Sequence, residues 1–265
     1  MTPSHTTTAT KMERIILAVL LTVIASCSAK PSEQIVGGSD AFNCELPHMV
    51  YIDIKLRDRD SFCGATLLSD KWILTAAHCV DGDVVGVDAH IGSTNKRNAS
   101  QVIKVRQWIP HPKYSLTHTV VHDVAVLELS EKVRLGKCVS PLSLPNKGDT
   151  YYGTCTAAGW GQTGNQGIFP NKLQRTRINI IPTSECQKQA AGITAEQHIC
   201  VGDNKDKGKN VCGGDSGGGL VCRRKSDNAY VVAGIASYVF DCDKGFGVYA
   251  NVANFLDYIK AYMSL

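Results

Sequence analysis

The sequence predicts an all-β protein that is stapled by disulfides and exported from the cell, and three observations support this. The chain has 265 residues and 11 Cys, a number typical of exported proteins. Its 24 Gly separate short alternating or β-branched runs, which favours strands over long helices. Hydrophobic residues make up 43% and charged residues 20%, so one large domain or two packed halves can bury a core.

The N-terminus has the pattern of a signal peptide. Lys11 and Arg14 precede an apolar run at 15–25, and small residues follow as far as Ala29. This run is shorter than the roughly 20 residues that a bilayer span needs. We therefore expect residues 1–29 to be an N-terminal extension and signal peptide, with a short membrane anchor as the alternative.

Cleavage near Ala29 also removes Cys27, which leaves an even number of cysteines and predicts five disulfides. The start of the chain stays open between Met1 and Met12, because the residues before Met12 are polar and add nothing to the signal. A formal net charge of +4 is too small for a nucleic-acid binder. We expect a secreted, extracellular protein that binds neither nucleic acid nor membrane.

Short strands and one helix are expected along the rest of the chain. Val252, Phe255 and Ile259 recur at helical spacing, which predicts a helix over 251–265 with one apolar face. Residues 203–210 are polar and Lys-rich, so a solvated loop is expected there. The predicted strands, which are separated by turns such as 81–83 and 163–165, are 48–56, 102–109, 123–129 and 230–239. Strands of this size favour a sandwich or barrel.

Ser216 is the candidate nucleophile. It lies in the run Gly214 to Gly219 (GDSGGG), where backbone N–H groups can approach a reacting carbonyl without obstruction by side chains. The run also fits the G-x-S-x-G pattern of α/β-hydrolases. Those enzymes place their His after the Ser, whereas the last histidine here is His198. The base must therefore lie upstream.

His78 and Asp123 are the candidate partners of this serine. His78 is followed by Cys79, and a disulfide to Cys63 would hold its imidazole in place. Asp123 opens an apolar strand, where a carboxylate is costly to bury unless it is hydrogen-bonded, and a His N–H is a suitable donor. The structural alternatives are a solvated histidine and a strand-capping aspartate.

The order His78, Asp123, Ser216 is that of the chymotrypsin family, and the chain resembles this family of secreted serine endopeptidases over residues 35–265. The motifs that carry the resemblance are IVGG at 35–38, LTAAHC at 74–79, DVAVL at 123–127, GWG at 159–161, CGGDSGG at 212–218 and GVY at 247–249. The subtilisin order would need Asp53 or Asp70 as the acid, but that family's sequence context is missing.

The resemblance implies two antiparallel six-stranded β-barrels packed with an active-site cleft between them, plus a C-terminal α-helix. The first barrel would span about 35–140, the second about 141–250, and the helix about 251–265. Within the cleft, His78 would act as general base, Asp123 would orient it, and the N–H groups of Gly214 and Ser216 would form the oxyanion hole.

The resemblance also implies activation by proteolysis. Residues 30–34 would be a short propeptide, and cleavage before Ile35 would free an α-amine that pairs with Asp215 and orders the oxyanion loop. Gln34 precedes Ile35 where an Arg or Lys is usual, so a tryptic activator is not expected. The identity of the activating protease stays open.

The family pattern proposes four disulfides, namely Cys63–Cys79, Cys155–Cys222, Cys186–Cys200 and Cys212–Cys242. Cys44 and Cys138 remain, and elimination pairs them. With the cysteines assigned to disulfides, no zinc site is expected. The loop at 93–98 lacks the carboxylates with which related enzymes bind calcium, so the sequence predicts no metal and no cofactor.

Carry-over from the family places the primary specificity pocket around Asn210. Asn210 lies six residues before Ser216, at the pocket floor, and its amide carries no charge to select a cationic side chain. The other pocket positions are Val211, Ser237, Tyr238, Val239 and Gly247. Val239 would narrow the pocket, as a valine does in pancreatic elastases.

The pocket predicts cleavage after uncharged, small to medium apolar residues. Trypsin-like cleavage after Arg or Lys stays as the alternative, because Asp241 and Asp243 could supply a negative charge from a position other than the pocket floor. Gly219 stands where the family usually has Pro, a change expected to affect backbone stiffness more than chemistry. Asn98 begins the glycosylation sequon Asn-Ala-Ser.

The expected partners are protein or peptide substrates, protein protease inhibitors and the activating protease, with the enzyme itself a monomer. The rival hypothesis from another class is a catalytically silent homologue that acts as a binding module. The complete set of His78, Asp123, Ser216 and Gly214 argues against that rival.

Overall fold

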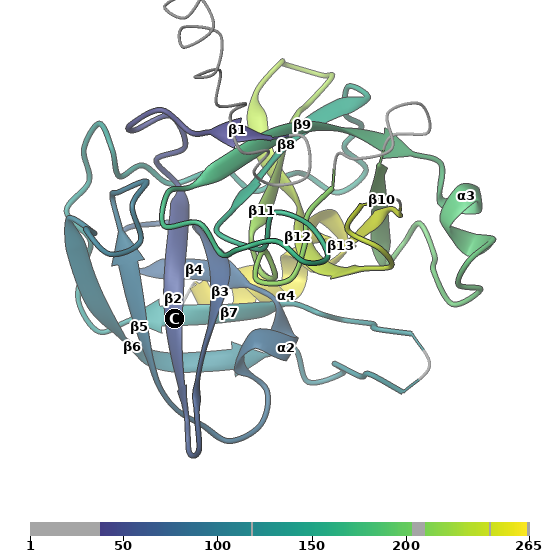
Figure 1. Cartoon of the computed structure of the whole chain (residues 1–265). Helices are drawn as coiled ribbons and strands as arrows, with labels where there is room; N and C mark the ends of the chain where they lie inside the picture. The colour runs from purple at the N-terminus through teal and green to yellow at the C-terminus, as the bar shows by residue number, and fades with distance from the viewer. Residues whose placement is uncertain (1–37, 118, 203–209, 244, 264–265) are drawn as a thin grey trace, which may run out of the picture. The chain divides into compact units, whose positions relative to one another are not determined.

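Six antiparallel strands between residues 49 and 129 close into the first β-barrel (Figure 1). They pair in the order β2-β3-β4-β7-β6-β5, and β5 returns to β2. Their bounds are β2 Met49–Leu56, β3 Asp60–Leu67, β4 Trp72–Thr75, β5 Val84–Ile91, β6 Gln101–Pro110 and β7 Ala125–Leu129. This computed structural model describes residues 38–117, 119–202, 210–243 and 245–263, all within one compact unit, Glu33–Leu265.

Six further strands close the second barrel in the order β8-β9-β10-β13-β12-β11, and β11 pairs back to β8. They are β8 Thr154–Gly159, β9 Gln174–Ile181, β10 His198–Gly202, β11 Gly219–Arg223, β12 Tyr230–Val239 and β13 Gly247–Asn251. The expected fold, two closed six-stranded antiparallel barrels and a C-terminal helix, is confirmed. Two short helices, α2 (Ala77–Val80) and α3 (Thr183–Gln187), interrupt the strands.

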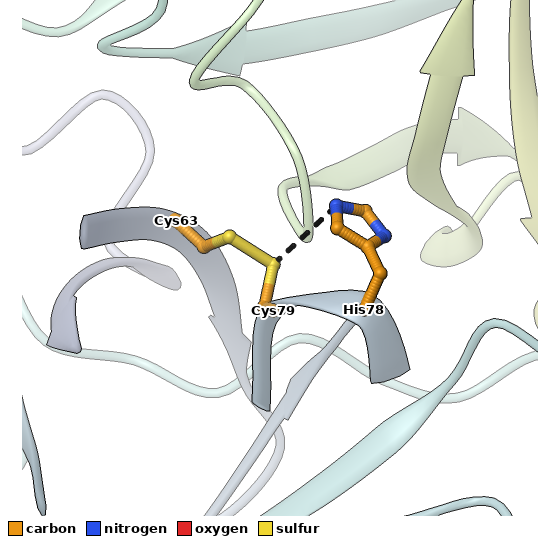
Figure 2. A group of neighbouring side chains, drawn as sticks. All are labelled: Cys63, His78 and Cys79. Carbon is orange, nitrogen blue, oxygen red and sulfur yellow. Dashed lines mark hydrogen bonds between the residues drawn. A yellow bond between two sulfur atoms is a disulfide. The ribbon is translucent and has the colours of Figure 1, made fainter. Parts of the chain in front are cut away.

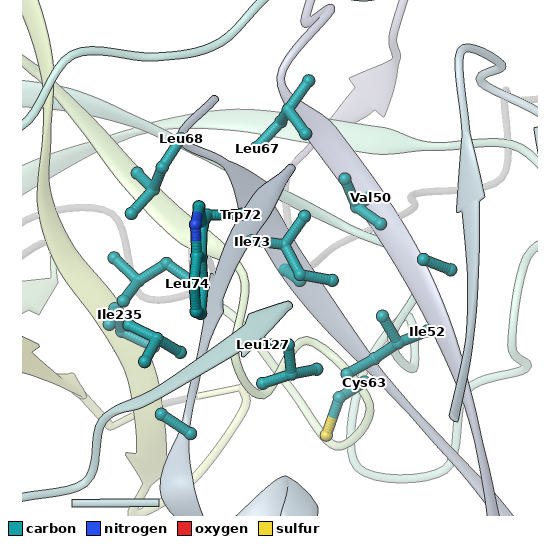
Figure 3. Close-up of a cluster of buried hydrophobic side chains, with 14 of the residues drawn as sticks. Val50, Ile52, Cys63, Leu67, Leu68, Trp72, Ile73, Leu74, Leu127 and Ile235 are labelled. Carbon is teal, nitrogen blue, oxygen red and sulfur yellow. The ribbon is translucent and has the colours of Figure 1, made fainter. Parts of the chain in front are cut away.

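Alternating side chains build the core of the first barrel (Figure 3). Val50, Ile52 and Ile54 recur at every second position of β2 and are buried, as the two-residue period of a strand requires. The same cluster takes in Ile235 from β12 of the second barrel. The two barrels therefore share apolar packing.

The two ends of the described chain cross over to the opposite barrel. Strand β1 (Ser39–Asp40), expected within the first barrel, pairs with β9 of the second. At the other end, Ile259 is buried in the core cluster of the first barrel, and the Tyr258 hydroxyl donates to the Ile109 carbonyl. These contacts tie the barrels together at positions far apart in sequence.

The C-terminal helix begins later than expected. A 3-10 turn, η1 (Val252–Asn254), comes first, and α4 spans Leu256–Met263. The non-helical backbone of Phe255 (φ −106°, ψ 11°) separates them. Within the described part of the chain, no helix is long and apolar enough to cross a membrane.

Candidate active site

The loop that carries Ser216 is clamped between the two barrels by backbone hydrogen bonds. Gly64 N–H from β3 donates to the Ser216 carbonyl at 2.8 Å, and Gly217 N–H donates to the Ala236 carbonyl of β12 at 2.8 Å. Gly217 has φ +78°, and a Cβ there would lie 2.1 Å from Thr75 Oγ1. The glycines after Ser216 are thus needed for the close approach of the two barrels.

His78 is brought to the same cleft by a disulfide. It lies on α2, directly after β4, and its neighbour Cys79 is bonded to Cys63. Cys63 in turn precedes Gly64, which holds the Ser216 loop. His78, Ser216 and Gly214 accordingly line one cleft of about 310 Å³.

Asp123 is buried and bound by three donors. Only 1% of it is exposed, and it lies two residues before β7, which begins at Ala125. His78 donates to it through its backbone N–H at 2.9 Å and through Nδ1 at 2.8 Å, and Ser237 Oγ donates at 2.5 Å. These bonds compensate the buried carboxylate and hold the proton of His78 on Nδ1, which leaves Nε2 as a proton acceptor.

A group of possible metal ligands also gathers at His78. The sulfurs of Cys63 and Cys79 and an imidazole nitrogen lie within 4.8 Å of one another. Figure 2 shows His78 Nε2 directed toward Cys79 Sγ, at 3.8 Å. Both sulfurs belong to the disulfide, however, and metals bind cysteine as the thiolate. The oxidised pair therefore has no thiolate to offer a metal.

Gly214, the expected oxyanion residue, is enclosed by two aromatic rings. It has φ +92°, and a Cβ would lie 2.9 Å from Phe62 and 3.0 Å from Phe169. The two rings meet edge to face with centroids 5.3 Å apart. Sequence reasoning missed both residues, because an isolated Phe in a strand and another in a loop give no signal that they will meet.

The side chain of Asp215, which precedes Ser216, fills a space left by the two glycines of the Gly-Trp-Gly motif. A Cβ at Gly159 would lie 2.0 Å from Asp215 Oδ1, and one at Gly161 would lie 2.6 Å from its carboxyl carbon. The N–H groups of Gly161 and Cys212 donate to the carboxylate at 2.8 and 2.9 Å. Burial nevertheless raises the pKa of Asp215 to about 6. Ile35, its expected partner, lies outside the described residues.

Asn210, Val211 and Gly247, three residues of the expected specificity pocket, lie close together, because a Cβ at Gly247 would lie 2.9 Å from Asn210 Oδ1 and 3.3 Å from Val211 Cγ2. Asn210 is buried, its amide oxygen accepts from Val211 N–H at 2.9 Å, and its amide nitrogen donates to the Asp241 carbonyl at 3.3 Å. Val239 of β12 pairs with Gly247 of β13, so these two expected wall positions lie side by side in the sheet. The lysine-rich residues 203–209 lie outside the described part of the chain.

Ser237 and Tyr238, expected as pocket wall, have further contacts. The Ser237 hydroxyl donates a hydrogen bond to the Asp123 carboxylate, so this residue contacts the candidate catalytic acid in addition to its expected place in the pocket wall. Burial raises the pKa of Tyr238 to about 12, and the Tyr238 ring packs against Phe240 with centroids 5.6 Å apart. No sequence pattern indicates the Ser237–Asp123 contact, because it depends on the packing of two barrels.

The remaining expected positions are also placed by the structure. Asn98 is exposed, in a turn where its N–H donates to the Asn95 carbonyl at 2.9 Å. Gly219 begins β11, and a Cβ there would lie 2.3 Å from Thr66 Oγ1. The five disulfides join the same cysteines as expected: Cys44–Cys138, Cys63–Cys79, Cys155–Cys222, Cys186–Cys200 and Cys212–Cys242.

Comparisons with known proteins agree with this architecture. The family model described as Trypsin matches residues 35–259. Granzyme-like protein 1 of Rattus norvegicus is 35% identical over 257 residues, which cover 94% of this chain and 98% of the relative. Trypsin 5G1 of Aedes aegypti is 35% identical over 242 residues, with 89% and 87% covered. The solved "Structure of GrC" matches with TM-score 0.78 and 32% identity, covering 87% of this chain and all of that one.

Proposed function

Because this chain belongs to the trypsin family of chymotrypsin-like serine endopeptidases, we propose that it cleaves proteins by attack of Ser216 and prefers small to medium apolar residues before the cut. One observation carries the assignment of roles. The Asp123 carboxylate binds His78 Nδ1 at 2.8 Å, and the same imidazole lines one cleft with Ser216. A serine hydroxyl becomes a nucleophile when an oriented base can take its proton.

The proposed reaction proceeds in two halves. Ser216 Oγ bonds to the carbonyl carbon while its proton moves to His78 Nε2, and the N–H groups of Gly214 and Ser216 stabilise the oxyanion. The peptide C–N bond then breaks as His78 returns the proton to the leaving amine, which leaves an acyl-enzyme. Water attacks the acyl carbon by the same proton route, releasing the acid and restoring Ser216.

The contacts of Asn210 support the proposed preference. Its amide is neutral and is already engaged with Val211 and with the Asp241 backbone. The trypsin-like alternative would draw on the carboxylates of Asp241 and Asp243. The first accepts from Asn165 Nδ2 at 3.0 Å and from Asp243 N–H at 2.8 Å, and the second accepts from Asn165 N–H at 3.4 Å. With Val239 opposite Gly247, the pocket suits an uncharged residue of limited size.

Secretion, activation and quaternary state complete the proposal. The enzyme would be secreted after cleavage near Ala29 and activated by cleavage before Ile35, whose amine would pair with Asp215. The buried carboxylate, with its raised pKa, is the kind of site that a cationic partner stabilises. The activating protease would accept Gln34 before the cut, and the mature enzyme would act as a monomer on protein or peptide substrates.

Two measurements test the proposal. After N-terminal sequencing shows Ile35 as the first residue, a fluorophosphonate probe should label the protein, and the Ser216→Ala variant should stay unlabelled. A set of peptide amides that differ only in the residue before the cut should be cleaved fastest after Ala, Val or Leu. Labelling that persists in Ser216→Ala would exclude Ser216 as the nucleophile, and faster cleavage after Arg or Lys would overturn the proposed preference.

A further inference from the structure

A second hollow, here called the arginine groove, lies on the second barrel away from the candidate active site. Its volume is about 670 Å³, and no lining residue is shared with the cleft of His78 and Ser216. The segment Glu45 to His48, just before β2, forms one side. Strands β8, β9 and β11 supply the other side. The volume falls in the range of about 300–1,000 Å³ that is usual for ligand sites.

Strand register aligns the groove's polar side chains. Arg177 of β9 lies opposite Thr156 of β8, and Thr156 lies opposite Val221 of β11. Arg175 is two residues before Arg177, so both project from the same face of β9. Arg223 is likewise two residues beyond Val221 on β11. Three arginines therefore line one hollow.

Two of these three arginines carry uncompensated charge. Arg175 is paired with Glu45, Nε to carboxylate, at 2.7 Å. Among the described residues, no carboxylate lies within ion-pair distance of Arg177 or Arg223, and both are exposed. Burial lowers the pKa of His48 to about 4, so this lining residue is neutral at pH 7. The positive charge of the groove thus comes from its arginines.

Apolar and aromatic surface accompanies this charge. Leu46, Leu142 and Val221 line the groove. Tyr152 and Tyr230 are 43% and 62% exposed there, and the Arg223 guanidinium lies 5.4 Å from the centre of the Tyr152 ring. Arginine and tyrosine are the residue types that dominate binding energy at protein interfaces.

We propose that the arginine groove binds an acidic peptide segment of another protein, with apolar side chains among its carboxylates. Arg177 and Arg223 would bind the carboxylates, and the leucines and tyrosine rings would contact the apolar side chains. A sulfated saccharide would match the charge but not the apolar surface. The chain's own residues 1–34 do not match the charge, because Glu13 and Glu33 are outnumbered by Lys11, Arg14 and Lys30.

Binding of a labelled peptide tests this proposal on the full chain. A fluorescein-labelled peptide of Glu-Glu-Leu repeats is titrated with the Ser216→Ala protein, which avoids cleavage, and anisotropy is measured at low salt, where charges are screened least. Arg177→Glu with Arg223→Glu should weaken binding by about tenfold or more, equal to about 1.4 kcal/mol. The matched control, Arg57→Glu with Lys104→Glu, changes the net charge equally at exposed positions of the first barrel that do not line the groove, and it should change binding by less than about threefold.

Three further arms make the result decisive. A peptide of Lys-Lys-Leu repeats should bind the charge-reversed variant better than the parent. Melting temperatures should show that the variants fold, and Arg177→Gln with Arg223→Gln replaces the reversed pair if that pair does not fold. Equal peptide binding by parent and variant would overturn the proposal. So would tighter binding of a heparin hexasaccharide that the same variant abolishes, because the ligand would then be a sulfated glycan.

Discussion

At the scale of single residues, glycines and buried carboxylates shape the site together. Gly159 and Gly161 leave the space that Asp215 fills, and Gly217 lets the Ser216 loop approach the first barrel. Each buried carboxylate is bound by donors from distant parts of the chain, such as Ser237 and His78 on Asp123. Small residues and hydrogen-bonded carboxylates therefore help to build the surroundings of Ser216.

Gly214→Ala tests the oxyanion position. The new Cβ would be strained at φ +92° and would lie 2.9 Å from Phe62, so the peptide N–H must shift. Loss of one oxyanion donor is expected to lower kcat by about 10²–10³. Gly136→Ala is the control, since a Cβ there meets nothing within 4 Å. Unchanged kcat in Gly214→Ala would contradict the assigned role.

Asp215 is expected to make the uncut protein less stable as pH rises. Its pKa rises from 3.8 to about 6 on folding, so the folded state holds more protons between these values. Stability should therefore fall across that interval through this group. His48, with its pKa lowered to about 4, makes stability rise with pH over the same interval. Its contribution is the same in wild type and in an Asp215 variant, so the difference between the two proteins reports Asp215 alone.

The measurement is the melting temperature of uncut Asp215→Asn minus that of uncut wild type. This difference should grow as pH rises from about 4 to about 7, and a constant offset from the new amide does not affect the trend. Cleavage before Ile35 should reverse the order at neutral pH, because the new amine would pair with Asp215. A difference that stays flat with pH would contradict the raised pKa.

At the scale of elements, an irregularity in β12 gives one strand two tasks. The pairing of β12 with β13 shifts register between Ala236 and Tyr238, as a β-bulge does. Ser237, at the shift, is directed to Asp123, whereas Val239 resumes pairing opposite Gly247. Within three residues the strand thus binds Asp123 and reaches the expected pocket wall.

Val239→Gly tests the wall. Removal of the isopropyl group should admit larger side chains, so kcat/KM for a Phe amide relative to an Ala amide should rise by about tenfold. Val102→Gly makes the same change at an exposed position of β6 and should leave the ratio unaltered. An unchanged ratio in Val239→Gly would show that this residue does not limit the pocket.

At the scale of the whole molecule, the barrels are joined by links that are distant in sequence. Strand β1 pairs with the second barrel, and α4 packs on the first. The Cys44–Cys138 disulfide spans a sequence separation of 94 residues, against 14 for Cys186–Cys200. A disulfide that closes a long loop removes the most conformational entropy from the unfolded chain, so Cys44–Cys138 should contribute strongly to stability.

Removal of the two disulfides in separate double Ser variants tests that expectation. Loss of Cys44–Cys138 should lower the free energy of unfolding by about 5 kcal/mol, and loss of Cys186–Cys200 by about 3 kcal/mol. Denaturant unfolding under oxidising conditions measures both. The reverse order would show that native packing, rather than chain closure, decides their contributions.

Much of the local structure could be predicted from the sequence, because it depends on neighbouring residues. The strand expected at 230–239 is β12 with the same bounds, and the strand at 102–109 lies within β6. The C-terminal helix was expected to begin too early, because the apolar spacing of Val252 and Phe255 does not report that Phe255 leaves helical geometry. Element ends depend on backbone conformation, which periodicity does not encode.

By itself the sequence determined which reactive side chains are present and what their immediate neighbours are: a serine among glycines, a histidine beside a cysteine, and an aspartate before an apolar strand. Only the tertiary structure decided which groups meet, such as Ser237 with Asp123, Phe62 with Phe169, and three arginines in one groove. The physical reason is that side-chain type and local period are properties of neighbouring residues. Contacts between strands of two barrels arise only when the closed sheets pack and bury their shared apolar surface.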